Sequence, residues 1–196
     1  MFNSILSQYI EHRLGVNMLG TQDCEKKIKN QFEVLKRIDT YIGTTNTKCT
    51  IVMSYCAAAT AFILTFLAKL DPANTSMQLM VGIGLFSVLA LALALVSMIL
   101  AALVIFPMTF SKPNAPKGAS LIFYGDIAAY GAEAYSEKFK NSTEDSFLED
   151  LNGQVYTLAF IATKKFSSIK LVTTILMIHF GCMAAVLTGA IIYYLF

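Results

Sequence analysis

Polar side chains that could bind a small anion gather where a long helical pattern meets the first apolar run of the chain. Between residues 37 and 48, the density of charged, amide and hydroxyl groups exceeds what anchoring a helix at a membrane surface needs. Asp39 and Asn46 are seven residues apart, so they share a face of a continuous helix. That face could meet the basic pair Lys164 and Lys165, which precedes the last apolar run. The patch predicts either a set of interhelical hydrogen bonds or a pocket for a small polar anion.

Motifs of enzymatic catalysis do not accompany this patch. The chain has no phosphate-binding loop, no dinucleotide-binding fingerprint and no nucleophile elbow. Its four cysteines have no CxxC spacing, and only two histidines could add nitrogen ligands, so we expect neither a metal site nor a cofactor. His179 lies inside the last apolar run, where a hydrogen bond to a neighbouring helix is favoured over a proton relay. We therefore expect a protein that is not an enzyme.

Three apolar runs free of Asp, Glu, Lys and Arg dominate the chain: 49–68, 79–106 and 171–196. Each is long enough for a hydrocarbon core about 30 Å thick, which needs roughly 20 residues of helix. Only 14% of the residues are charged, against about 25% in an average soluble domain. The sequence predicts an all-α membrane protein with three transmembrane helices, the first two forming a hairpin over 49–106.

The cationic residues predict the orientation of these spans, because lysine and arginine concentrate on the cytoplasmic side. They precede the first span and fill the segment 107–170, whereas the connection 69–78 has only one. We expect segments 1–48 and 107–170 in the cytoplasm and the C-terminus outside. Pro72 and Asn74 predict a tight turn between spans one and two. The net charge of +2 gives no reason to expect a nucleic-acid partner.

Both cytoplasmic segments have helical patterns. In segment 1–48, apolar residues recur at three- and four-residue steps from Ile28 to Ile42, and this helix should run straight into span one. The segment 107–170 predicts a helical pair, the first helix covering 119–139 and the second leading unbroken into span three. The predicted fold is thus three spans with a small cytoplasmic helical bundle that is continuous with them.

The second helix of this pair has recognisable start signals. Ser142 followed by Asp145 resembles a capping box, after a break at Asn141 and Ser142. An acidic cluster opens the helix, and we interpret it as a complement to the helix dipole rather than as catalytic; its members are Glu144, Asp145, Glu149 and Asp150. Lys165 interrupts the apolar stripe, and its long side chain could snorkel.

Small residues recur every four positions in the last span, at Gly181, Ala185 and Gly189. Such spacing lets helix backbones approach closely. It predicts helix–helix packing, either within the chain or between copies, and we expect a homo-oligomer.

From about Leu35 to the C-terminus, the chain resembles a known family, the transmembrane effectors of bacterial Pycsar antiphage systems (PycTM). The first matching elements lie around the first span: Asp39, Tyr41-Ile42, Asn46 and Lys48. The later ones follow in order: Pro107, Ser120 to Tyr124, Asp126 to Ala128, Tyr135, Asp150-Leu151, Gln154 and Lys165-Phe166. The chain departs from the family pattern at Tyr41, where tryptophan is expected, and at Asn46, where aspartate is expected.

The resemblance implies a function. A partner cyclase would make a cyclic pyrimidine mononucleotide (cCMP or cUMP) during phage infection, and the effector would then damage the bacterial inner membrane. If this chain binds the nucleotide, the ligand must sit among its helices, because no block has the size and strand content of a standard cyclic-nucleotide-binding domain. The hypothetical cleft has lysines for the phosphate and a tyrosine to stack on the base; its residues are Asp39, Tyr41, Asn46, Lys48, Tyr124, Tyr135, Gln154, Lys164 and Lys165.

Two other functions remain open. The chain could be a small oligomeric channel, although few polar residues lie in the spans of one copy. It could also be a membrane scaffold whose helical bundle docks a partner protein.

Overall fold

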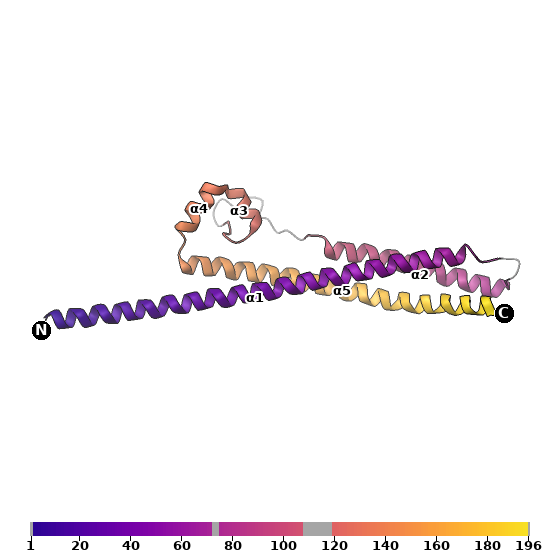
Figure 1. Cartoon of the computed structure of the whole chain (residues 1–196), viewed down its shortest axis with the longest axis horizontal. Coiled ribbons are helices and arrows are strands. Elements are labelled where there is room, and N and C mark those ends of the chain that lie inside the picture. Colours follow the sequence, from indigo (N-terminus) through magenta and orange to yellow (C-terminus); the bar gives the residue numbers. More distant parts are fainter. Residues whose placement is uncertain (1, 72–74, 108–118, 196) are drawn as a thin grey trace. The chain divides into compact units, whose positions relative to one another are not determined.

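The computed structural model describes residues 2–71, 75–107 and 119–195, with side chains described from Gln22 onward. These residues form helices and connecting segments without any strand (Figure 1). The helices are α1 (Phe2–Leu67), α2 (Met77–Ile105), α3 (Tyr124–Tyr130), α4 (Ala132–Lys140) and α5 (Glu144–Leu195). The predicted all-α fold is confirmed.

Helices α1, α2 and α5 are each long and apolar enough to cross a membrane, so the three predicted transmembrane helices are confirmed. Neither α1 nor α5 contains a proline, the residue that most often breaks a helix. As predicted, each continues from a polar stretch into an apolar one without interruption. The chain is a membrane protein whose long helices extend well beyond the length that a bilayer requires.

The residues divide into two compact units. The apolar unit comprises residues 41–107 and 162–196, and the polar unit comprises residues 1–40 and 108–161. Both α1 and α5 contribute residues to each unit, whereas α2 belongs to the apolar unit, and α3 and α4 belong to the polar unit.

Three buried clusters hold α1, α2 and α5 together in the apolar unit, and each cluster takes residues from all three helices. The cluster at the Cys49 end includes Val104 and Val172, and the cluster at the opposite end includes Phe66 and Val186. The third cluster joins Ile63, Ala90 and Cys182.

The two faces of α2 differ in the size of their side chains. Its buried face is made mostly of small residues at three- and four-residue steps: Ile83, Ser87, Ala90, Ala94, Ser97, Ala101 and Val104. Its large aliphatic residues point outward, among them Leu85, Val88 and Leu103, each more than half exposed. In water this arrangement would be unfavourable, but in lipid the large side chains are solvated by acyl chains while small ones allow close helix contact. The packing therefore agrees with a membrane environment.

In the polar unit, α5 packs on α1 along the predicted apolar stripes. The rings of Phe32 and Phe147 lie 6.2 Å apart between centroids, and Leu151 is fully buried. The Nε2 of Gln31 donates to the Oδ1 of Asn152 at 2.7 Å. Helices α3 and α4 pack on each other, and the ring of Phe139 on α4 lies 6.1 Å from that of Phe147.

The prediction of a single helix over 119–139 is wrong. Residues 119–123 are not helical, and the rest is split into α3 and α4 at Gly131. Gly131 has a φ of +76°, a left-handed conformation that ends a helix and that residues with a Cβ rarely adopt. A helical sequence pattern does not report a backbone angle, so the break at Gly131 is visible only in the structure.

The start of α5 was predicted one residue too early. Thr143, not Ser142, caps the helix, because its Oγ1 accepts from the N–H of Ser146 at 3.2 Å. The hydroxyl of Ser142 instead donates to the carbonyl of Phe139 at the end of α4. The break itself is confirmed, and Glu144 and Asp145 occupy the first turn as the helix dipole favours.

The connection between α1 and α2 is described only at its ends. Ser76 caps α2 by accepting from the N–H of Leu79, and the N–H of Asp71 donates to the hydroxyl of Tyr193 at 3.2 Å. Pro72 and Asn74, on which the turn prediction rests, lie outside the described residues.

Candidate functional site

A buried lysine joins the three helices of the apolar unit. Lys165 on α5 is only 5% exposed, and its Nζ donates to the Oδ1 of Asn46 on α1 at 3.0 Å. The same Nζ donates to the carbonyl oxygen of Val104 on α2. We refer to these three groups as the Lys165 clamp. Lys165 does not snorkel, because its ammonium is buried and donates to two acceptors inside the unit.

The position of Val104 explains why its carbonyl is available. It lies in the last turn of α2, where carbonyl groups lack partners within the helix and the helix dipole is negative. An ammonium at this end of a helix acts as a cap. Both acceptors of Lys165 are electrically neutral. These two contacts therefore do not neutralise the positive charge of the buried ammonium. Such a cation would gain from an anionic ligand.

Three other predicted residues lie near the clamp along the same helices. The ring of Tyr41 on α1 meets the ring of Phe166 edge-on, with centroids 6.4 Å apart. Lys48 and Lys164 are exposed. The structure thus brings Asn46 and Lys165 together. Phe166, the residue after Lys165 on α5, pairs with Tyr41 on α1.

A second polar network lies in the polar unit, and the sequence analysis did not predict that its residues are hydrogen-bonded to one another. Oδ2 of Asp150 accepts from the hydroxyl of Ser120 at 3.1 Å and from the N–H of Leu121 at 2.7 Å. Oδ2 of Asp126 accepts from the N–H of Ser120 at 2.8 Å. The Oγ of Ser120 also accepts from the N–H groups of Ile122 and Phe123, each at 3.0 Å. Asp150 therefore does more than complement the helix dipole, since it fixes the non-helical segment 119–123 on α5.

Tyrosine and lysine side chains complete this network. The hydroxyl of Tyr130 and the Nζ of Lys138 both donate to the carbonyl of Ala119, and that Nζ also contacts the Tyr130 hydroxyl. The hydroxyl of Tyr135 donates to the carbonyl of Leu121 at 3.2 Å. These bonds satisfy the backbone of a segment that has no helical hydrogen bonds of its own.

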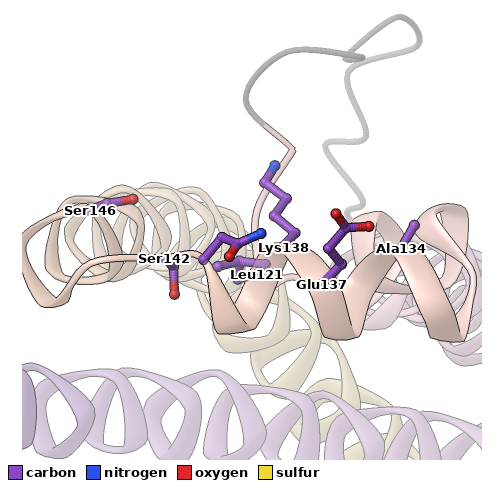
Figure 2. A pocket seen from close by; sticks show the side chains of 7 residues that line it. Leu121, Ala134, Glu137, Lys138, Ser142 and Ser146 are labelled. Carbon is purple, nitrogen blue, oxygen red and sulfur yellow. The ribbon is translucent and has the colours of Figure 1, made fainter.

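An open groove of about 430 Å³ lies beside α4 and the start of α5 (Figure 2). Figure 2 shows Ala134, Glu137 and Lys138 along α4, with Ser142 and Ser146 beyond its end. Leu121 and Asn141 complete the lining. A smaller groove of about 280 Å³ runs between α1 and α5, lined by Lys27, Asn30, Gln31, Val34, Leu148 and Asn152.

The remaining residues of the predicted cleft belong to the polar unit. Asp39 is exposed on α1, and Tyr124 is 67% exposed at the start of α3. Tyr135 and Gln154 are half-buried, and Tyr135 is engaged with Leu121. The complete cleft therefore stays a prediction. Among the described residues, no group of three histidine, cysteine or acidic side chains could hold a metal ion.

The small residues of the last span, which the sequence predicts to pack against another helix, differ in their burial. Gly189 is buried, and a Cβ there would lie 2.7 Å from the Cγ1 of Ile83 on α2, so this glycine allows close packing within the chain. Ala185 is half-buried, while Gly181 is exposed, with nothing near the position of a Cβ.

His179 makes the predicted interhelical hydrogen bond. Its Nδ1 lies 3.0 Å from the carbonyl oxygen of Ala90 on α2, and its ring meets that of Tyr55 edge-on. Its Nε2 and the hydroxyls of Ser87 and Ser97 are buried without a hydrogen-bond partner among the described residues.

Comparison with known proteins identifies the family. The model of the Pycsar effector protein domain, PycTM, matches residues 30–194, which include the Lys165 clamp and the network around Ser120. The chain belongs to the Pycsar effector family. The resemblance noted in the sequence is thereby confirmed, for a chain with three helices long and apolar enough to cross a membrane.

One curated Pycsar effector illustrates the relationship. The Pycsar effector protein SaPycTM of Staphylococcus aureus is 32% identical over 99 residues, which is 50% of this chain. The match spans only 60% of the length of that relative. No solved structure matches the chain.

Proposed function

We propose that this Pycsar effector responds to a cyclic pyrimidine mononucleotide, cCMP or cUMP, and then impairs the integrity of the bacterial inner membrane. A partner cyclase would supply the nucleotide during phage infection. The observation that carries the proposal is that the family match runs through all three helices able to cross a membrane. The effector would act non-enzymatically, through rearrangement or oligomerisation of these helices.

The Lys165 clamp supports the idea that the chain itself senses the nucleotide. The phosphodiester of a 3′,5′-cyclic nucleotide carries one negative charge, and charge-assisted hydrogen bonds to an ammonium are among the stronger ones. Lys165 is a buried cation whose bound acceptors are neutral, so it offers this charge a partner. Tyr41, beside Phe166, would provide a surface on which the base could stack.

The distribution of cationic residues supports the proposed orientation. Lysine and arginine concentrate in segments 1–48 and 107–170, so the N-terminus would face the cytoplasm and the C-terminus the outside. A nucleotide made in the cytoplasm would then reach the polar side chains directly.

Dye release from liposomes tests the proposal. Purified full-length protein is reconstituted in vesicles of phosphatidylethanolamine and phosphatidylglycerol, and cAMP, cGMP, cCMP and cUMP are added separately. Release with cCMP or cUMP alone is the expected result. Equal release with all four would contradict pyrimidine specificity. No release with any of them would favour a membrane scaffold or a sensor in another chain.

A further inference from the structure

The Lys165 clamp has a property that a simple ligand-binding residue lacks, because the same ammonium already holds helices together. It connects α5 to the side chain of Asn46 on α1 and to the last turn of α2. The two contacts use two of the three N–H donors of this ammonium, and an anion, which binds an ammonium more strongly than a neutral acceptor does, would draw the same nitrogen away from them.

The clamp lies at one end of the apolar unit, next to the cluster that contains Cys49 and Val172. At the opposite end, Phe66 and Val186 pack with Ile83, and the hydroxyl of Tyr193 accepts from the backbone of Asp71. Loss of the clamp would therefore loosen the contacts at one end while the other end keeps its packing.

Between these ends, the interior contains polar atoms that would favour water. The hydroxyls of Ser87 and Ser97 and the Nε2 of His179 are buried without partners among the described residues. A buried polar group without a partner is costly, and hydration would remove that cost. Separation of α2 from its neighbours would thus be favoured by wetting of this interior.

We infer that Lys165 is a latch: in the resting chain it caps α2 and holds α1, and an anionic phosphate that binds its ammonium releases the end of α2. The inference rests on the proposed function, in which that phosphate belongs to a cyclic nucleotide. The clamp would then have two states. It is closed when the ammonium donates to the neutral acceptors on Asn46 and Val104, and open when the ammonium binds an anion. Binding and helix release are then one event, because both use the same nitrogen.

Replacement of Lys165 separates a latch from a binding residue. In the liposome assay, Lys165→Met should leak without nucleotide, about tenfold faster than the unmodified protein, and cCMP or cUMP should add nothing; allosteric couplings are typically about 5- to 150-fold. Lys170→Met, which removes an exposed lysine on the same helix, should behave like the unmodified protein. A folded Lys165→Met protein that stays tight, or equal leakage by Lys170→Met, would overturn the latch.

Changes at Asn46 provide a second test, which does not depend on the folding of Lys165→Met. Asn46→Asp places a carboxylate beside the ammonium and should strengthen the latch, so roughly tenfold more nucleotide is needed for release. Asn46→Leu removes one acceptor, and about fivefold less nucleotide should suffice. Shifts in the same direction, or no shift in either variant, would contradict the inference.

Failure of the proposed function gives a different pattern. If no cyclic nucleotide releases dye from the unmodified protein, the proposed ligand is wrong. Basal leakage of Lys165→Met above that of Lys170→Met would still support the latch, and its absence would refute it.

Discussion

Asp150 fixes Ser120 on α5 through one oxygen atom. Its Oδ2 accepts the hydroxyl of Ser120 at 3.1 Å and also the N–H of Leu121 at 2.7 Å. Ser120 in turn satisfies two further N–H groups of the same segment. The two residues are 30 positions apart, and both fall in elements that the family shares. Their contact determines where the non-helical segment ahead of α3 is attached.

Asp150→Ala should destabilise the polar unit by about 1–3 kcal/mol, because it leaves the Leu121 N–H and the Ser120 hydroxyl without their acceptor. Amide hydrogen exchange at Leu121 should accelerate correspondingly. Glu149→Gln, a change at the exposed neighbour, is the control and should alter neither quantity. Unchanged exchange at Leu121 in Asp150→Ala would show that the bond is not formed in solution.

A double-mutant cycle measures how strongly the two residues are coupled. Ser120→Ala and Asp150→Asn should each lower the free energy of unfolding, and the double variant should lose less than the sum. We expect a coupling of about 0.5–3 kcal/mol, the range for residues in one hydrogen-bond network. Additive losses in urea denaturation would argue against direct contact.

Substitution by alanine should change the stability of the polar unit in opposite directions at two of its glycines. Gly131→Ala should cost about 1–3 kcal/mol, because a Cβ is strained at a φ of +76° and a ψ of 159°. Gly153→Ala, in the interior of α5 with open space around it, should gain about 0.5–1 kcal/mol from helix propensity. Thermal unfolding in detergent distinguishes the two outcomes. The same sign for both substitutions would mean that Gly131 does not adopt the left-handed conformation.

Gly189 and Gly181 form a second matched pair, in the apolar unit. Gly189→Ala should destabilise by about 1–3 kcal/mol, since the added Cβ would lie 2.7 Å from the branched Cγ1 of Ile83. Gly181→Ala should be nearly neutral, because nothing lies near its added methyl group. Melting temperatures in the same detergent give the comparison. A costly Gly181→Ala would instead reveal that this exposed face is covered, as it would be between copies.

Cys24 should react slowly with alkylating reagents. Burial raises the pKa of its thiol, and the neighbouring charges of Asp145 and Glu144 raise it further, so less of the reactive thiolate is present at a given pH. The Sγ lies 3.8 Å from the Oδ1 of Asp145. Asp145→Asn removes one of these charges, which lowers the pKa, and the profile of alkylation rate against pH should move to lower pH. Mass spectrometry measures the rate at this cysteine.

The control for this profile is Glu149→Gln, which removes a charge from the same helix at a residue that does not contribute to the shift. Its profile should coincide with that of the unmodified protein. An equal displacement in both variants would assign the effect to overall charge rather than to Asp145.

Local sequence properties were sufficient for the membrane architecture. Whether a stretch can cross a bilayer depends on its length and on the absence of charge, which can be counted without knowing any contact. The continuity of α1 and α5 followed equally directly, because neither contains a proline. The hydrogen bond of His179 was predictable too, since a buried imidazole in a span must find a partner on another helix.

Short-range signals were less reliable at the ends of elements. Ser142 and Thr143 are both good capping residues, and the sequence does not say which of them leaves the helical conformation first. The separation of α3 from α4 depends on the backbone angle of Gly131, which helix periodicity does not report. Asp145 suits the first turn of α5 in either register.

Only the tertiary structure decided the environment of Lys165. In the sequence it is a lysine in an apolar stripe, for which snorkelling is the usual outcome. Asn46, which stands where the family pattern has aspartate, gave no sign that it contacts this lysine. Its two acceptors lie 119 and 61 residues away along the chain, and one of them is a backbone carbonyl, which any residue possesses. A helix end becomes an acceptor site only where another helix brings a cation to it. That juxtaposition is a property of packing, so the sequence determined the three membrane helices and the fold determined what fastens them together.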